Sequence, residues 1–381
     1  MQIRNNILSF FLLLIPVSMY SQWIPENLLS TVQLPENGNN KFVLAIDMTS
    51  FFKNNEYFSP IEKGRTLPGT NFSPRIAYQT NNKFRAELGV YSIYFSGEQE
   101  RDNKSIFVDG IFARMQYAVT PEFNVVLGNI YGGLNHRLIE PLFQWERQLM
   151  EKPESGLQFT YQNQRYFGDI WIDWQRYIER GDPVPELLTF GMSLEGKLTK
   201  PRNQLQVSVP FQLLINHSGG QINVSKPPMV VMGNAVSGIC AEYFPEEGFL
   251  KSVALKTYIA GYYDKLPNKE QRPYREGWGT YPVIQLNSTS FSFMTGYWYA
   301  KQFYALNGES LFGSFNPYYP DELLPERELL TVKLMYSQQL LKNLNIGAGI
   351  ETYTDLGLKS TDYSFNVYLR FNSEFVLKKF Q

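Results

Sequence analysis

From residue 41 onward the chain reads as about 16 runs in which apolar and polar positions alternate. The clearest runs lie at 188–199, 204–216 and 363–372. In the first run, one face holds Leu188, Phe190, Met192, Leu194 and Leu198, and the other holds Thr189, Ser193, Glu195, Lys197 and Thr199. These runs extend over about 10 residues or more, whereas soluble strands average about 5–6. They are therefore long enough to cross a bilayer at a tilt.

The connections between the runs alternate between short and long. Short connections are predicted at 80–82, 120–122, 167, 201–202, 245–249, 289 and 342–344. Long ones are predicted at 52–69, 98–104, 132–155, 179–185, 218–229, 265–276, 306–328 and 356–360. Membrane β-barrels show this asymmetry, with tight periplasmic turns, long extracellular loops and an even strand number. The pattern predicts an all-β fold, a closed antiparallel transmembrane β-barrel of about 16 strands.

Two of the runs are irregular. The fourth carries Asp109 on its apolar face, and the tenth has no clear alternation. Counts of about 14 or 18 strands therefore also fit the sequence.

The N-terminus has the pattern of an export signal. Arg4 supplies a positive charge, the segment 7–17 is mostly apolar, and Ser18 and Ser21 supply small residues near a cleavage site. We expect a signal peptide at 1–21, an N-terminal periplasmic segment at 22–40 and the transmembrane barrel at 41–381. The expected location is the outer membrane of a Gram-negative cell.

Composition excludes several other classes of protein. The mature chain has no apolar stretch long enough for a membrane-spanning helix, and its net charge of −1 gives no support for nucleic-acid binding. The single Cys240 cannot form an internal disulfide, and two histidines are too few for a typical histidine metal site. We therefore expect no metal and no cofactor. The 28 Phe and 25 Tyr suit aromatic girdles, to which we assign Tyr262, Tyr263, Trp298 and Tyr299.

The end of the chain adds a resemblance. The segment 363–371 resembles the aromatic-ended last strand that outer-membrane assembly machinery recognises, although Phe380 is a second aromatic candidate. Over residues 41–380 the chain resembles a porin-like outer-membrane β-barrel of the Bacteroidota type. The resemblance implies contact with outer-membrane lipid and with the assembly machinery during insertion. A homo-oligomer or a larger envelope complex remains open.

The long connection at 132–155 is the third outer loop, and porins fold a similar loop into the lumen. Charges in a constriction set selectivity, so we predict pore-narrowing roles for Arg137, Glu140, Glu146 and Arg147. We predict that Glu195, Lys197 and Arg370 line the wall. The alternative is a loop that packs on the outer rim.

One segment resembles the catalytic region of outer-membrane phospholipases. His217 and Ser218 are adjacent here, whereas those enzymes separate the two residues by one position. Neighbouring strand residues point to opposite faces, and Gly219 and Gly220 favour a turn. The sequence thus predicts no catalytic residue and a protein that is not an enzyme.

The function predicted from the sequence is passive diffusion of small hydrophilic solutes through a lumen narrowed by the 132–155 loop. One alternative is a non-conducting barrel that serves as an accessory subunit of an outer-membrane complex. A second is a lipid hydrolase that depends on Ser218, and a third is a soluble secreted β-protein.

Overall fold

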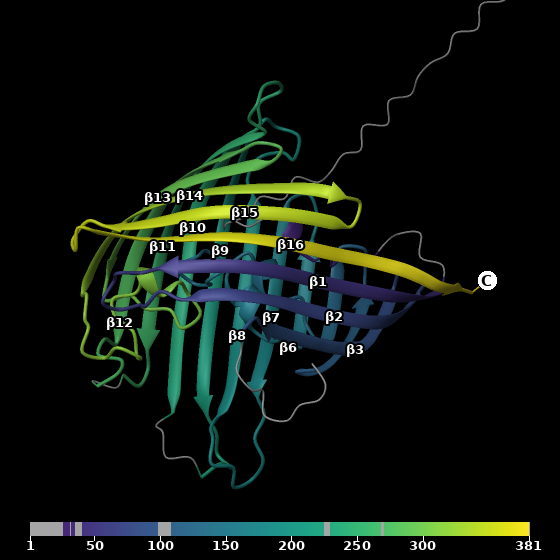
Figure 1. The fold of residues 1–381 in the computed structure, drawn as a ribbon, viewed down its shortest axis with the longest axis horizontal. Helices are drawn as coiled ribbons and strands as arrows, with labels where there is room; N and C mark the ends of the chain where they lie inside the picture. The colour runs from purple at the N-terminus through teal and green to yellow at the C-terminus, as the bar shows by residue number, and fades with distance from the viewer. Residues whose placement is uncertain are drawn as a thin grey trace, which may run out of the picture.

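The computed structural model describes residues 26–30, 32–34, 40–97, 108–224, 229–267 and 270–380. Within these residues sixteen antiparallel strands form one closed barrel, and each strand pairs with its neighbours in chain order (Figure 1). The barrel closes where β1 pairs with β16. The predicted fold class and strand number are confirmed. The predicted signal peptide lies outside the described residues.

The strands vary from 7 to 20 residues in length. They are β1 Lys41–Glu56, β2 Thr66–Thr80, β3 Phe84–Phe95, β4 Gly110–Ala118, β5 Phe123–Asn129, β6 Ser155–Gln162, β7 Tyr166–Arg176, β8 Glu186–Lys197, β9 Leu205–Gly219, β10 Val230–Tyr243, β11 Ser252–Asp264, β12 Glu276–Asn287, β13 Phe291–Lys301, β14 Glu326–Leu341, β15 Leu344–Asp355 and β16 Ser360–Lys379. The short helices are η1 Glu26–Leu28, η2 Gly133–His136, α1 Arg147–Met150 and η3 Ser310–Phe312. Among the described residues no helix is long and apolar enough to cross a membrane.

The short turns lie at one end of the barrel, as the sequence predicts, with one local error. The turn expected at Phe167 lies at 163–165, and Phe167 is inside β7. The side-chain oxygen of Asn163 accepts hydrogen bonds from the backbone N–H groups of Arg165 and Tyr166, both 2.8 Å long. This is the local chemistry by which Asn favours a turn. Asp109 likewise lies outside β4, where its carboxylate accepts a hydrogen bond from the N–H of Ile93.

The two faces of the strands are inverted relative to a soluble protein. In β9 the polar residues Gln206, Ser208, Gln212 and Asn216 are buried, whereas Leu205 and Phe211 are exposed. Apolar side chains that face outward are what a lipid-exposed barrel requires. The alternation predicted for this strand is confirmed. Burial of the polar face follows from a lumen that is filled with protein.

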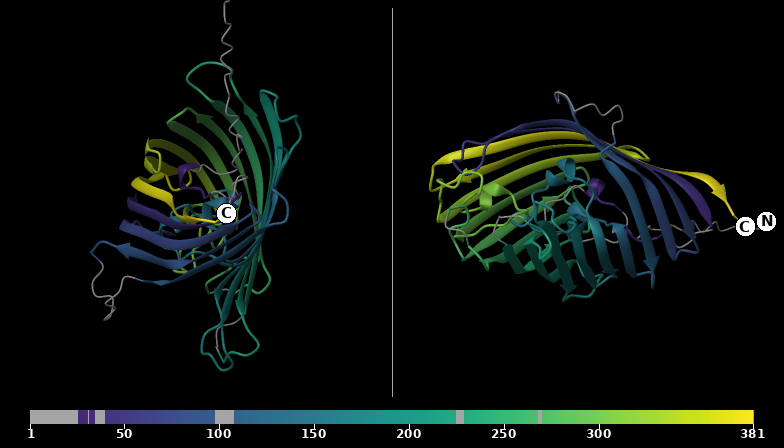
Figure 2. Two further views of the ribbon diagram at one scale, coloured as in Figure 1. Left: turned by 90° about the vertical axis from the view of Figure 1, so that its right-hand side faces the viewer. Right: turned by 90° about the horizontal axis from the view of Figure 1, so that it is seen from below.

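Three segments fill the lumen inside the ring of strands (Figure 2). They are the described N-terminal residues 26–30 and 32–34, the loop 130–154 between β5 and β6, and the loop 302–325 between β13 and β14. Loop 302–325 explains why the assignment of Trp298 to an aromatic girdle at the membrane interface is wrong. Trp298 is fully buried and donates a hydrogen bond of 3.0 Å to the carbonyl of Phe312 in η3. Trp298 therefore anchors a loop inside the barrel, and Tyr262 is buried there as well.

Candidate functional site

Loop 130–154 crosses the lumen and returns to the wall from which it starts. The N–H of Ile139 donates to the side chain of Gln212 in β9, at 2.9 Å. Farther along, Asn55 in β1 donates to Glu146 at 2.7 Å, and Lys152 donates to the carbonyl of Gln175 in β7 at 2.7 Å. The loop therefore enters the lumen, which agrees with the predicted third-loop arrangement and excludes packing on the rim.

Buried charges fix the loop to the wall. Lys333 of β14 binds both Glu140 of the loop and Glu351 of β15, the latter at 2.8 Å. Lys53 of β1 binds the other oxygen of Glu351 at 3.0 Å. Tyr353 donates to Glu140 at 2.5 Å. A buried carboxylate is costly without a paired cation, so the two lysines hold the loop in one position.

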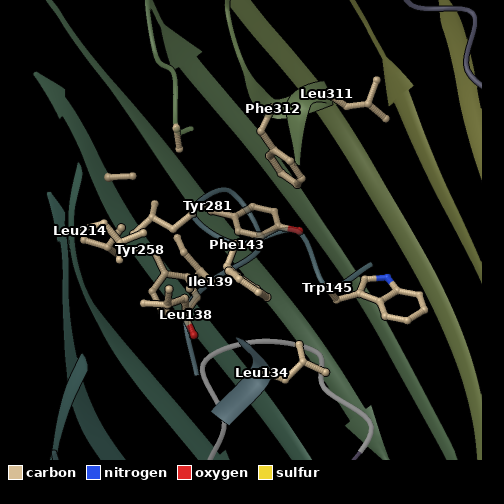
Figure 3. Close-up of a cluster of buried hydrophobic side chains, with 14 of the residues drawn as sticks. Leu134, Leu138, Ile139, Phe143, Trp145, Leu214, Tyr258, Tyr281, Leu311 and Phe312 are labelled. Carbon is tan, nitrogen blue, oxygen red and sulfur yellow. The ribbon is translucent and has the colours of Figure 1, made fainter. Parts of the chain in front are cut away.

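Apolar packing supplies the rest of the contact between the loop and its surroundings. Leu134, Leu138, Ile139, Phe143 and Trp145 of the loop are buried in one cluster. Wall residues Leu214, Tyr258 and Tyr281 and loop residues Leu311 and Phe312 belong to the same cluster (Figure 3). The two inward loops therefore share one core, and this core lies inside the barrel.

The four loop charges that the sequence groups at a constriction have different nearest partners in the structure. Glu140 is buried beside Lys333, and Glu146 pairs with Arg65 at 2.6 Å. The guanidinium of Arg137 stacks on Phe167 with 3.7 Å to the ring centroid. Arg147, the first residue of helix α1, pairs with Glu151 at 2.8 Å. Their predicted role in solute selection stays a prediction.

The three predicted wall residues occupy two different settings. Glu195 and Lys197 lie half-buried at the inner end of β8. Arg370 of β16 pairs with Asp47 at 2.9 Å and donates to the carbonyls of Asn27 and Leu29 at 2.9 and 3.1 Å. Arg370 therefore holds part of the N-terminal segment inside the lumen.

A second buried polar arrangement in the lumen surrounds His136, at the end of η2. Its Nδ1 lies 2.7 Å from Asp169 Oδ2, and its Nε2 lies 2.9 Å from Glu154 Oε2. The ring stacks on Trp171 with 3.5 Å between centroids and an angle of 5°. We call this arrangement the Asp169–His136–Glu154 relay. No local pattern in the sequence predicts this relay, because His136 is separated from its partners by 18 and 33 positions.

The two carboxylates hold His136 in the protonated form. Burial by itself lowers the pKa of His136, but the charges of Glu154 and Asp169 outweigh it and raise the pKa to about 10. For Glu154, burial by itself raises the pKa, but the imidazolium outweighs it and leaves the pKa lowered. At neutral pH the relay is therefore a carboxylate, an imidazolium and a second carboxylate.

Glu154 lies where two cavities meet. The inner cavity, of about 170 Å³, lies between loop 130–154 and the lumen side of β1 to β4. The outer cavity, of about 920 Å³, opens between the same loop and loop 302–325. Arg147, Glu151, Lys152 and Glu154 line both. Glu154 is thus the end of the relay that faces open space, since its side chain is 20% exposed and that of His136 only 1%.

Other candidate chemistry is weaker. His217 and Ser218 are neighbours on β9, where they pair with Leu188 and Leu187 of β8. Because neighbouring residues on a strand face opposite sides, the two side chains are not placed to act together. Within the described residues, no group of three or more His, Cys, Asp or Glu side chains is arranged to hold a metal ion.

Comparison with solved structures bears on the fold. OprD of Pseudomonas aeruginosa shares 8% identity with the chain at a TM-score of 0.52, covering 91% of this chain and 98% of that one. A BenF-like porin of Pseudomonas fluorescens shares 8% identity at a TM-score of 0.50, covering 88% and 99%. At these identities the likeness shows an outer-membrane porin fold. The Bacteroidota attribution stays a prediction.

Comparison with protein families corrects one expectation. No curated protein matches the chain at a significant level. A model of Lipid A 3'-O-deacylase-type proteins, however, matches residues 34–380, which include all sixteen strands. This family is named for an enzyme activity, so the prediction that the protein is not an enzyme is contradicted. The chain belongs to the Lipid A 3'-O-deacylase-type family.

Proposed function

We propose that the protein is an outer-membrane hydrolase that removes an ester-linked acyl chain from a lipid A-type lipid of the outer leaflet. Glu154 is the proposed general base. The family match supplies the reaction class. The observation that carries the proposal is the position of the Asp169–His136–Glu154 relay beside β5 and β6, the two shortest strands of the barrel.

The strands β5 and β6 are the shortest of the barrel, with 7 and 8 residues. β3 has 12 residues, so at about 3.3 Å per residue β5 is about 16 Å shorter than β3. Residues 110–113 of β4 extend beyond the first pair that joins β4 to β5, Arg114 and Gly128. Glu154 directly precedes β6 at this level. A lipid of the outer leaflet can therefore approach the relay from the side, over the ends of β5 and β6.

The chemistry needs one water molecule and the side chains already described. Glu154 takes a proton from the water, and the hydroxide attacks the ester carbonyl carbon. Arg147 and Lys152, which line the same junction, stabilise the negative charge on the carbonyl oxygen. The acyl C–O bond then breaks, and Glu154 returns the proton to the sugar alkoxide. His136 and Asp169 keep Glu154 oriented and ionised.

The test is fatty-acid release from lipid A in mixed micelles, measured by mass spectrometry with the full chain. Glu154→Gln should lower the rate by about 100-fold or more, because general base catalysis contributes about 10²–10⁴. Ser218→Ala and the exposed loop variant Glu179→Gln should retain activity. Absence of release by the wild type would refute the hydrolase. Full activity of Glu154→Gln, or lost activity of Ser218→Ala, would refute this site.

A second candidate function is a narrow channel for small hydrophilic solutes. The specific observation in its favour is that the inner and outer cavities share four lining residues. Leu28 and Ser30 of the N-terminal segment also line the inner cavity. This segment would have to move away from the cavity for a solute to pass through the lumen. Single-channel recording after reconstitution tests this. Removal of residues 22–34 should raise the single-channel conductance. If neither the wild type nor the shortened variant gives a measurable conductance, the protein is not a channel.

A further inference from the structure

The inner cavity carries an excess of positive charge. Its lining includes Arg75, Arg114, Arg147, Lys152 and Arg370 against three carboxylates, those of Asp47, Glu151 and Glu154. Each of these three carboxylates already has a cationic partner, namely Arg370, Arg147 and His136 respectively. The cations left without a carboxylate of the lining are Arg75, Arg114 and Lys152.

Arg75 of β2 and Arg114 of β4 share one carboxylate with a third arginine. Glu87 of β3 lies 3.0 Å from Arg75, 2.9 Å from Arg85 and 3.8 Å from Arg114. Arg85 has a further partner in Glu374, at 2.5 Å. Among the described residues, Arg75 and Arg114 have no carboxylate within ion-pair distance other than Glu87. One positive charge therefore remains uncompensated in a buried setting, which is costly without a counter-charge.

Aromatic rings hold these two guanidinium groups rigid. Arg75 lies over the ring of Phe112, with 4.6 Å to the centroid. Arg114 lies over Tyr131 at 3.8 Å and over Phe112 at 4.9 Å. Arg114 also donates to the carbonyls of Asn129 and Ile130 at 2.6 and 3.0 Å. A stacked guanidinium loses little further freedom when it binds a planar oxyanion or a phosphate.

We propose that the inner cavity is a binding site for a small anion that carries a carboxylate or phosphate group, with Arg75 as its main charge partner. The cavity volume of about 170 Å³ is well above the roughly 10–15 Å³ that admits one water molecule. Thr49, Ser73 and Asn71 add polar side chains to the lining. The inner cavity shares Glu154, Arg147 and Lys152 with the proposed hydrolytic step, but the proposed anion partner is a different residue, because Arg75 lies on β2 and the relay joins β7 to loop 130–154.

The test measures anion-dependent thermal stabilisation of the full chain in detergent, at constant ionic strength with chloride as the reference salt. Inorganic phosphate or succinate should raise the unfolding temperature of the wild type and of the exposed-turn variant Arg165→Met. Arg75→Met should weaken the apparent affinity at least tenfold. Glu87→Gln removes the shared carboxylate and should strengthen binding. The two variants should therefore change the apparent affinity for the anion in opposite directions.

The source of the anion is separated by a second set of probes. Stabilisation by succinate and phosphate indicates a soluble anion. Stabilisation only by micelles that contain a lipid phosphate monoester indicates a lipid headgroup, and either result supports the site. The proposal is overturned if none of the three probes stabilises the wild type. It is also overturned if Arg75→Met and Glu87→Gln, both shown to be folded by heat-modifiable gel migration, bind like the wild type.

Discussion

Lys333 should be the residue on which the position of loop 130–154 depends most. Its ammonium group binds Glu140, Glu351 and the hydroxyl of Tyr353, the last two at 2.8 Å. In Lys333→Met, Glu351 keeps Lys53 and the indole N–H of Trp145 as partners. Glu140 keeps only the hydroxyl of Tyr353, and its second oxygen has no hydrogen-bond partner among the described residues.

The expected loss of stability in Lys333→Met follows from this difference between Glu140 and Glu351. Removing one partner of a buried ion pair costs about 3–5 kcal/mol because a buried charge is left uncompensated. Here one such charge remains, on Glu140, so we expect the free energy of unfolding to fall by about 3–5 kcal/mol. The double variant Lys333→Met/Glu140→Gln removes the uncompensated charge, and it should recover about half of that loss.

Equilibrium unfolding in urea, with the protein folded into phospholipid vesicles, measures these changes. Lys301→Met is the matched control, because Lys301 forms an exposed ion pair with Glu326 at 2.8 Å and exposed pairs contribute little. Limited proteolysis should also cleave loop 130–154 faster in Lys333→Met than in the control. If Lys333→Met is as stable as Lys301→Met, or if the double variant is less stable than the single one, Lys333 does not stabilise loop 130–154 by compensating the charge of Glu140.

Two further predictions concern the same loop. His136 should make the stability of the protein fall at alkaline pH, because its pKa is raised to about 10 in the folded protein. Its contribution to the free energy of unfolding is therefore complete below about pH 6.5 and is lost as the pH rises through about 10. His136→Asn should remove this dependence from urea unfolding measured between pH 7 and pH 10.5, and an unchanged slope would contradict the relay. Gly308→Ala should force apart the two inward loops, because a Cβ at this position would lie 2.1 Å from the carbonyl oxygen of Pro141. We expect a loss of about 1–3 kcal/mol, whereas Gly196→Ala, whose Cβ would make only ordinary contacts, should be close to neutral.

The barrel could be predicted because its causes are local in sequence. Alternation in a strand such as β9 reports which face meets lipid, and the alternation of short and long connections reports which end carries the loops. The strand number of about 16 follows from these patterns, whereas the inward course of loop 130–154 is implied by the resemblance to porins and that of loop 302–325 has no signal in the sequence. The error in the position of the β6–β7 turn also has a local cause. The side chain of Asn163 accepts hydrogen bonds from the backbone of Arg165 and Tyr166, and the turn therefore lies at 163–165.

The candidate site could not be predicted, because its residues meet only across the lumen. Nothing in the sequence near His136 indicates that Glu154 and Asp169 occupy its two ring nitrogens. The same is true of Arg75 and Arg114, which come together with Glu87 because three strands are neighbours in the wall.

The sequence by itself determined the antiparallel β-barrel and the end that carries the long loops, since both follow from a repeat of two residues and from loop length. Only the tertiary structure decided that loops 130–154 and 302–325 both turn inward, that Glu140 and Glu146 form ion pairs with Lys333 and Arg65, that Arg370 holds the N-terminal segment, and that an imidazolium lies between Asp169 and Glu154. The physical reason is that charges in a lumen find partners across the barrel, at sequence separations that no local pattern records.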